Sequence, residues 1–287
     1  MRLVKFFVVV VAACAVGILL LRLAYPLPAS NYSHQTSKKS PSWDGPLGAV
    51  INAAMSRNQG RDGVRPLRNG RAAFAARAIL SREAVSSIDA QYYIWQDDVT
   101  GLMLLDELRS AAERGVRVRL LVDDNGINGL DELLAELDDL PTASVRLFNP
   151  FTLRSPKYLS YIFDFNRLNR RMHNKSITFD GVATIIGGRN IGDIYFNYGS
   201  GTHYLDVDVI AIGPIVEEVS DAFDTYWNSG SAYDAAVILP SSSNMDLENL
   251  ANAARASAGG VGYQKAIKEN TLTAGLAEKT LKFEWSD

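Results

Sequence analysis

The 287-residue sequence has a single cysteine, Cys14, so it cannot form a disulfide bond within the chain. The cysteine count therefore does not indicate whether the protein works in an oxidising or a reducing compartment. Histidine is also scarce, with three in the chain. Charge of one sign is not in excess: 29 Lys and Arg against 32 Asp and Glu give a net charge of -3 and a sequence pI near 5.7. Proteins that bind a nucleic-acid backbone usually carry a basic surface. A nucleic-acid partner is therefore disfavoured.

One long hydrophobic run is present, at the N-terminus. Arg2 and Lys5 precede the uncharged stretch 6–21, and Arg22 follows it. A helix of this length rises about 24 Å, and the basic side chains at its ends can reach the headgroups. Residues 1–25 therefore fit either a membrane anchor or a cleaved signal, and we expect an anchor. Basic residues on both sides leave open which face of the membrane holds the domain.

The rest of the chain divides by composition. Residues 26–46 are rich in Ser, Pro and Lys, which predicts a flexible linker. From residue 47 to about 230, helical periods alternate with short apolar runs, which is typical of an α/β sandwich with a mostly parallel central sheet and helices on both faces. Asp123 and Asp124 end one predicted strand, where ligands often bind, but capping of the next turn is favoured. Residues 231–287 have a weaker pattern, with a glycine-rich break at 258–262 and a strand at 281–285.

Residues 172–190 hold the densest group of chemically active side chains. His173 and Lys175 are two residues apart, so in an extended chain both point to one face. Asp180 and Gly181 predict a hairpin turn, after which a second apolar run returns toward the same end. A histidine nucleophile beside a cation and an amide suits phosphoryl transfer through a phosphohistidine.

The spacing H-x-K-x4-D-x6-G-G-x-N in this stretch resembles the signature of the phospholipase D superfamily, with Gly188 where Ser is more usual. The wider sequences RRMHNKS and GGRNIGD, together with residues 89–98, 115–125, 146–151 and 205–214, resemble the cardiolipin synthase C type within it. The resemblance covers roughly residues 65–230. It implies a phospholipase D-like fold for residues 47–230 and an enzyme that works without a metal or a cofactor.

The resemblance also implies the site. The catalytic residues would be His173, Lys175, Asp180, Asn190 and Asp206, and the substrate-binding residues would be Gly187, Gly188 and Arg189. Within this set Asp206 is expected to accept a hydrogen bond from His173, and Asp180 is expected to be mainly structural. The implied substrate is a phospholipid, with phosphatidylglycerol expected, at a bacterial inner membrane.

A second H-x-K motif, which the family mechanism uses to protonate the leaving alcohol, does not occur in the sequence. His34 and His203 have Thr36 and Leu205 where a lysine would be needed. Three interpretations remain. The chain is a truncated synthase that needs a complementary second half; or it is a homodimeric phospholipase or nuclease whose site forms across a two-fold axis; or it is an inactive lipid-binding remnant. Residues 231–287 would be an inter-half linker or a truncated tail.

Residues 151–171 mix aromatic and basic side chains just before the motif. They predict either a core-packing helix with a solvated basic face, or a lipid-facing lip that attracts anionic headgroups. The sequence does not separate these two interpretations.

Overall fold

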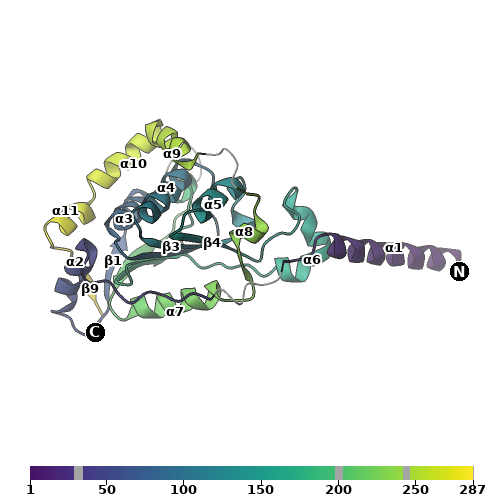
Figure 1. The fold of residues 1–287 in the computed structure, drawn as a ribbon, viewed down its shortest axis with the longest axis horizontal. Coiled ribbons are helices and arrows are strands. Elements are labelled where there is room, and N and C mark those ends of the chain that lie inside the picture. Colours follow the sequence, from purple (N-terminus) through teal and green to yellow (C-terminus); the bar gives the residue numbers. More distant parts are fainter. Residues whose placement is uncertain (29–34, 198–202, 242–245, 287) are drawn as a thin grey trace.

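A computed structural model of the chain describes residues 1–28, 35–197, 203–241 and 246–286 (Figure 1). Its strands are β1 (Gly63–Leu67), β2 (Ser87–Tyr92), β3 (Arg117–Asp123), β4 (Ala143–Phe148), β5 (Ser176–Phe179), β6 (Ala183–Gly187), β7 (Asp208–Ile212), β8 (Ala232–Asp234) and β9 (Glu284–Trp285). Its longer helices are α1 (Arg2–Ala24), α2 (Pro46–Met55), α3 (Gly70–Glu83), α4 (Val99–Glu113), α5 (Asp131–Asp138), α6 (Tyr161–Leu168), α7 (Ile215–Trp227), α9 (Leu247–Ala256) and α10 (Ala258–Lys268). Shorter helical elements are α8 (Ala235–Ile238), α11 (Thr271–Ala277), η1 (Asp124–Gly126), η2 (Lys157–Ser160) and η3 (Asp193–Tyr195).

The described strands form one sheet in the order β8-β4-β3-β2-β5-β6-β7-β1-β9. Helices α3, α4 and α5 cover one face, with α9 and α10 packed outside them, and α7 lies on the other face (Figure 1). This is the expected α/β sandwich. The central strands β2 and β3 are buried almost throughout because helices cover both faces.

The expectation of a mostly parallel sheet needs a correction. Only the pairs β2–β3 and β3–β4, each joined through a helix, are parallel. The pairs from β2 through β5, β6, β7 and β1 to β9, and the pair β4–β8, are antiparallel. The sheet is mixed because the motif half of the domain is made of a tight hairpin and its neighbours rather than of strand-helix-strand units.

The hairpin between β5 and β6 is the turn that the sequence predicts. Asp180 and Gly181 both have positive φ, at 53° and 65°, as the two central residues of this kind of two-residue turn require. The carboxylate of Asp180 is fully buried and accepts hydrogen bonds from the backbone N–H groups of Val85, Ser86 and Ser87 at 2.7 to 3.1 Å. It therefore ties the hairpin to the start of β2.

Two expectations about the rest of the chain are changed by packing. Residues 35–45 do not hang free as a linker: Lys38 pairs with Glu217 and Asp221 on α7, and Thr36 accepts hydrogen bonds from Arg119 and Trp227. These contacts are polar and distant in sequence, so composition gave no sign of them. Residues 232–285 add the edge strands β8 and β9 to the same sheet, and α9 and α10 pack on α4 and α3.

The predicted glycine-rich break at 258–262 is instead the start of α10, with Ser257 as its N-cap. A Cβ atom on Gly260 would lie 2.1 Å from the carbonyl oxygen of Ala254. Glycine is therefore needed because α10 begins in close contact with the end of α9. The predicted linker or tail role of residues 231–287 stays a prediction, but in this chain they are part of the packed domain.

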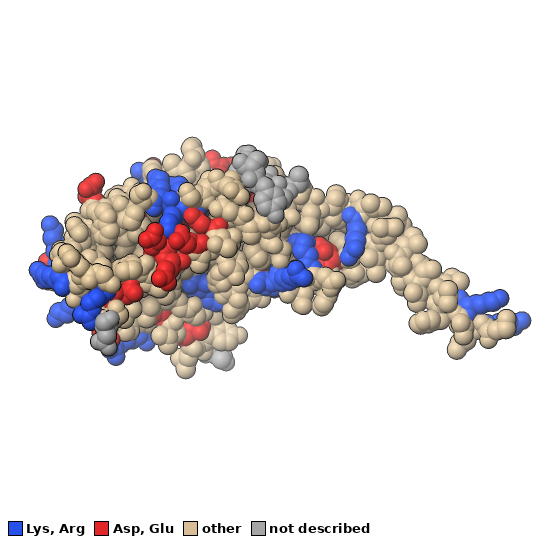
Figure 2. All heavy atoms as spheres, turned by 90° about the horizontal axis from the view of Figure 1, so that it is seen from below, with Lys and Arg blue, Asp and Glu red and all other residues tan. Residues whose placement is uncertain are grey.

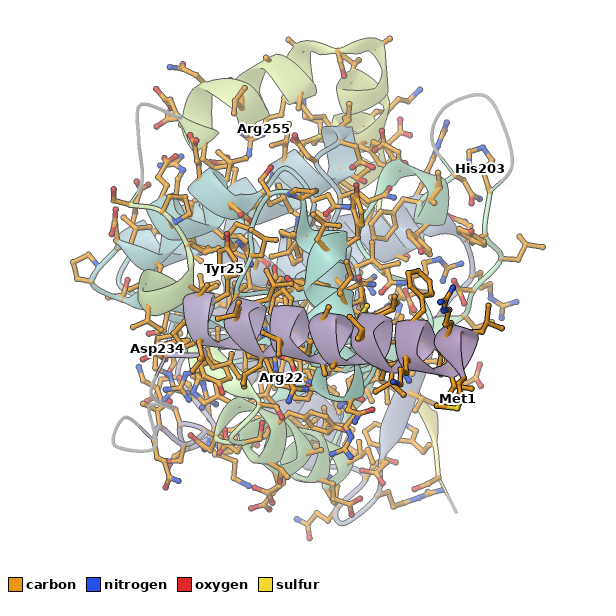
Figure 3. All side chains as sticks on the ribbon, turned by 90° about the vertical axis from the view of Figure 1, so that its right-hand side faces the viewer. Met1, Arg22, Tyr25, His203, Asp234 and Arg255 are labelled. Atoms are coloured by element: carbon orange, nitrogen blue, oxygen red, sulfur yellow. The ribbon has the colours of Figure 1, made fainter. Side chains whose placement is uncertain are left out.

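Helix α1 projects from the domain and has no buried residues (Figures 1 and 3). Among the described residues it is the one helix long and apolar enough to cross a membrane, with a mean hydropathy of 2.8. Arg22 lies in its last turn, and Tyr25 follows its end. This agrees with the predicted span of residues 1–25, by length and composition.

Candidate active site

His173 and Lys175 lie together at the start of the hairpin, just before β5. The His173 side chain is exposed, whereas Lys175 is 9% exposed. Lys175 Nζ is 3.2 Å from His173 Nδ1 and donates a hydrogen bond of 2.7 Å to the His173 carbonyl oxygen. Burial lowers the pKa of Lys175, and the negative charge of Asp206 partly opposes this shift. The predicted pairing of a histidine with a cation is therefore present.

The ring of Tyr93 packs against both His173 and Lys175. Its ring centre is 4.8 Å from that of His173, and Lys175 Nζ lies 5.6 Å from the Tyr93 ring centre. The tyrosine follows β2, which pairs with β5 so that Gln91 lies opposite Ser176. Sequence reasoning missed Tyr93; the available signal was an aromatic residue just after a strand adjacent to the motif strand.

Asp123, at the end of β3, holds the backbone that leads into His173. One of its oxygens accepts a 2.8 Å hydrogen bond from the N–H of Met172, and the other accepts from Asn125 at 3.0 Å. Burial raises the pKa of this carboxyl to about 6, although Arg171, 3.2 Å away, and the two N–H groups oppose the shift. Asp123 therefore positions the motif and caps the turn, as favoured from sequence, rather than facing a ligand.

The glycine pair returns beside this site at the end of β6. Gly187 is exposed, and the N–H of Gly188 donates to the carbonyl oxygen of Val207 at 3.1 Å. A Cβ atom on Gly188 would lie 2.3 Å from an oxygen of Asp206, so the absence of a side chain lets this carboxylate approach the turn. Asn190 Oδ1 accepts a 3.0 Å hydrogen bond from the N–H of Ile94. The N–H of Gly188 and the side-chain oxygen of Asn190 therefore both form hydrogen bonds within the chain.

Asp206 lies between the glycine pair and Lys175, just before β7. It is partly exposed, and its charge acts on Lys175. No hydrogen bond joins it to His173 within the described residues, where Lys175 Nζ is the neighbour of His173 Nδ1. The predicted Asp206–His173 hydrogen bond is therefore not made in this arrangement and stays a prediction for the substrate-bound site.

Arg189 does not face the site as a substrate ligand would. It is 4% exposed, its Nε donates to the Tyr195 carbonyl oxygen at 3.2 Å, and its Nη1 is 3.5 Å from Asp208. Asp208 also accepts from the N–H of Arg189 at 3.2 Å and pairs with Arg77 at 3.0 Å. The assignment of Arg189 to substrate binding needs a correction: its charge is used in a buried network that fixes the backbone after the glycine pair.

Asp180 is likewise outside the reacting centre. It lies at the opposite end of β5 from His173, and its carboxylate is occupied by three backbone N–H groups. Its place in the catalytic set is corrected to the structural role that the resemblance implied. The described residues contain no group of three or more His, Cys, Asp or Glu that could hold a metal ion.

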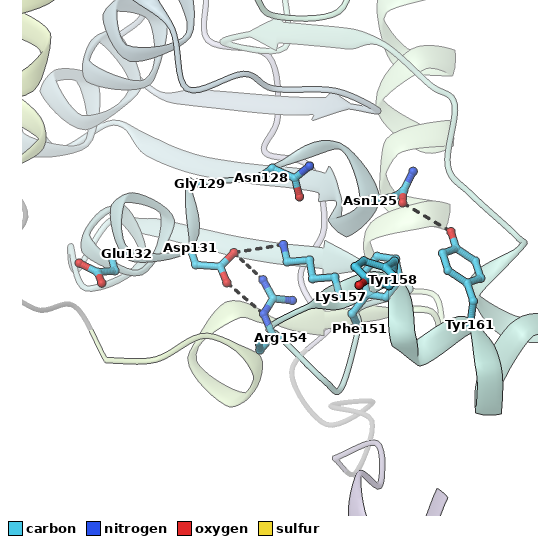
Figure 4. A pocket seen from close by; sticks show the side chains of 10 residues that line it. All are labelled: Asn125, Asn128, Gly129, Asp131, Glu132, Phe151, Arg154, Lys157, Tyr158 and Tyr161. Carbon is cyan, nitrogen blue, oxygen red and sulfur yellow. Dashed lines mark hydrogen bonds and ion pairs between the residues drawn. The ribbon is translucent and has the colours of Figure 1, made fainter. Parts of the chain in front are cut away.

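A cavity of about 530 Å³, lined by both polar and aromatic side chains, opens beside the site, between η1, η2 and the start of α6 (Figure 4). Asn125 lines this cavity and donates a hydrogen bond of 3.5 Å to the hydroxyl of Tyr93, the residue that packs against His173. The two cationic side chains that line the cavity are already paired. Arg154 and Lys157 contact Asp131 at 2.5 and 3.3 Å and also bind Asp124. Because these charges are compensated, the cavity is not a free anion site.

Comparisons with known proteins agree with the motif. The family model described as "Cardiolipin synthase, PLD-like domain" matches residues 79–227. Cardiolipin synthase C of Escherichia coli (strain K12) is 54% identical over 181 residues, which are 63% of this chain and 38% of that protein. Cardiolipin synthase of Staphylococcus aureus (strain Mu50) is 32% identical over 154 residues, which are 53% of this chain and 30% of that protein. The chain thus matches less than half the length of these relatives.

Among solved structures, the phospholipase D family member Nuc of Salmonella typhimurium is similar, with 17% identity and a TM-score of 0.43, over 60% of this chain and 97% of that one. The family match spans the site, from α3 through β5, β6 and β7 to the end of α7. The resemblance read from the motif is confirmed, and the chain belongs to the phospholipase D-like family of cardiolipin synthases.

Proposed function

We propose that the chain is a cardiolipin synthase-like phosphatidyltransferase that acts on phospholipid phosphodiesters through a phosphohistidine at His173. The observation that carries this proposal is the exposed His173 ring beside the buried ammonium group of Lys175, at the spacing of the family motif. An exposed nucleophile next to a fixed cation is what attack on an anionic phosphodiester needs.

The proposed reaction has two steps. In the first, a ring nitrogen of His173 attacks phosphorus, a P–N bond forms, and the bond from phosphorus to the leaving alcohol oxygen breaks. Lys175 turns from His173 Nδ1 to a non-bridging phosphoryl oxygen, and the ionised Asp206 accepts a hydrogen bond from the N–H of the other ring nitrogen. In the second, an acceptor alcohol gives its proton to the group that protonated the leaving alcohol and attacks phosphorus, and the P–N bond breaks. Phosphatidylglycerol as acceptor gives cardiolipin, whereas water gives phosphatidic acid.

The leaving alcohol needs a proton from a general acid within hydrogen-bond reach. The sequence holds one H-x-K motif, so we propose that the second comes from another chain, either a second copy or a complementary half. The surface beside Asp206 supports this: Leu205 is 93% exposed and Val207 is 73% exposed. Apolar side chains at the edge of a half-site suit contact with a partner. We further propose that α1 anchors the domain in the bacterial inner membrane.

A homodimeric phospholipase is the second candidate, because the same exposed edge would serve a two-fold pair. The test is turnover of labelled phosphatidylglycerol by the full chain in proteoliposomes, with cardiolipin, phosphatidic acid and free glycerol separated. We expect turnover in the wild type, none in His173→Ala, and nearly full turnover in the control Asn174→Ala, because neighbouring side chains of an extended chain point to opposite sides.

The products separate the transferase from the phospholipase, and mixing experiments separate the two possible sources of the second motif. If two copies share one site, adding excess His173→Ala protein to a constant amount of wild type lowers turnover, because mixed dimers lack one histidine. Wild-type protein that is inactive alone and becomes active with the second half of a cardiolipin synthase supports the half-enzyme. Unchanged turnover in His173→Ala would overturn both.

A further inference from the structure

Three large apolar side chains on η2 and α6 are open to solvent. Tyr158, Ile162 and Phe165 are 68%, 59% and 56% exposed. They lie four and three residues apart in sequence, on η2 and on the two sides of a break in α6 at Asp164, whose backbone is not helical, and we call them the exposed stripe. Phe163 and Leu168, in the same helix, are buried. A segment with both buried and exposed large apolar side chains needs a second environment that covers the exposed ones.

Helix α6 lies beside the end of α1. Arg22 Nε donates to the carbonyl oxygen of Phe163 at 2.6 Å, and the rings of Tyr25 and Phe163 stack with centres 6.1 Å apart. Figure 3 shows Arg22 and Tyr25 at the end of α1 that meets the domain. Helix α6 is therefore held at the level of the last turn of α1.

Because α6 lies beside the last turn of α1, the position of α1 in a bilayer sets the depth of α6. When an apolar helix crosses a membrane, arginine and tyrosine at its end lie in the headgroup region. An amphipathic segment at this depth buries its apolar side about 5 to 10 Å into the boundary of the acyl chains. Lys and Arg side chains, with an acidic group among them, gather where the domain joins the projecting helix, whereas the acidic side chains of α7 lie farther along the same face (Figure 2). This distribution favours an anionic lipid surface near α6.

Ion pairs connect the segment that carries the exposed stripe to the strand that positions the motif. Lys157, in η2, contacts Asp124 at 3.0 Å and Asp131 at 3.3 Å, and Arg154 binds the same two carboxylates. Figure 4 shows Arg154 and Lys157 converging on Asp131. Asp124 directly follows β3, whose last residue, Asp123, holds Met172. The stripe and the motif are therefore fixed to the end of one strand.

We propose that the exposed stripe docks into the same bilayer leaflet that surrounds the end of α1, and holds His173 at the membrane surface. His173 follows Leu168, the end of α6, by five positions, a span of at most about 17 Å. The site then receives phospholipid from that leaflet rather than from solution. The inference rests on the proposed membrane anchor.

Environment-sensitive labels on single cysteines test this in the full chain. The native Cys14, in α1, reports the anchor. In a Cys14→Ser background, Ile162→Cys reports the stripe, and Val261→Cys on α10 is the matched control, because Val261 is 58% exposed against 59% for Ile162. Each protein is labelled with a nitrobenzoxadiazole dye and reconstituted in phosphatidylcholine vesicles containing phosphatidylglycerol. Brominated lipids then quench any label that contacts acyl chains.

We expect strong quenching at position 14 and at least about twofold more quenching at 162 than at 261, with the label at 162 quenched best by bromines near the headgroups. Quenching at 14 with equal values at 162 and 261 overturns the docking while leaving the anchor in place. A blue shift at 162 without lipid quenching means that protein covers the stripe, and also overturns it. No quenching at 14 contradicts the anchor and the docking together.

Discussion

Lys175 Nζ lies 3.2 Å from Nδ1 of His173, so the cation of the motif contacts one nitrogen of the histidine ring. Burial lowers the pKa of this lysine, and the charge of Asp206 raises it again in part. The charged form is needed to bind a phosphoryl oxygen and is lost as pH rises through the lowered pKa.

We expect turnover to fall on the alkaline side at a lower pH than an exposed lysine would give. Asp206→Asn removes the charge that supports the ammonium form, so its alkaline limb should move to still lower pH, whatever happens to the maximal rate. The measurement is kcat/KM against pH for both proteins. A limb that stays in place or moves upward would show that Lys175 and Asp206 are not coupled in the working enzyme.

Substitutions at Gly188 test its closeness to Asp206. A new Cβ atom would lie 2.3 Å from an Asp206 oxygen, so the carboxylate must move away. A serine hydroxyl can donate a hydrogen bond to the displaced carboxylate, whereas an alanine methyl cannot. We expect turnover in the order wild type, Gly188→Ser, Gly188→Ala, and we expect the alanine effect to be small in an Asp206→Ala background. If the effects of Gly188→Ala and Asp206→Ala on turnover are additive, the Gly188 substitution does not act through Asp206.

Asp180 should affect stability rather than chemistry. Its removal leaves the backbone N–H groups of Val85, Ser86 and Ser87, the last of them buried, without their acceptor. Asp180→Ala should therefore lower the free energy of unfolding by about 3 kcal/mol, and Asp180→Asn, which keeps one oxygen, by less. Denaturant melts give these values, and kcat per folded molecule should stay near that of the wild type. A stable Asp180→Ala protein without turnover would return Asp180 to the catalytic set.

The raised pKa of Asp123 predicts a pH-dependent stability. Its carboxyl has a pKa of about 6 in the folded chain against an ordinary 3.8, so between these values the folded state binds more protons than the unfolded state. This contribution to stability is fully present below pH 3.8 and is lost as pH rises through about 6. Asp123→Asn lacks it. The difference in melting temperature between wild type and Asp123→Asn should therefore shrink as pH rises from about 4 to 7. A constant difference would argue against the raised pKa.

The sequence predicted features that depend on neighbours along the chain. The amphipathic helices, the Asp180–Gly181 turn and the pairing of His173 with Lys175 follow from spacing alone, and each is present. It did not predict contacts between distant residues. Asp208 meets Arg77 from 131 positions away. An arginine within the apolar face of α3 was the available signal that a buried partner was required.

The same limit explains the errors at the site. Arg189 adjoins the glycine pair in sequence, which suggested a phosphate ligand, but the chain turns it inward to Asp208. In an extended chain Asp206 and Asp208 would lie on one face, but β7 begins only at Asp208, so their environments differ. Asp208 is buried and paired, whereas Asp206 stays near Lys175.

The central claim is that His173 becomes covalently bonded to phosphorus, and trapping this adduct tests it most directly. The full chain, supplied with its second motif if it is inactive alone, is mixed with phosphatidylglycerol, quenched in alkali, digested and analysed by mass spectrometry. We predict a peptide that carries a phosphoryl or phosphatidyl group on His173, formed as fast as turnover and lost when acceptor alcohol is added. Turnover without this adduct, or with an adduct on another residue, would contradict the account.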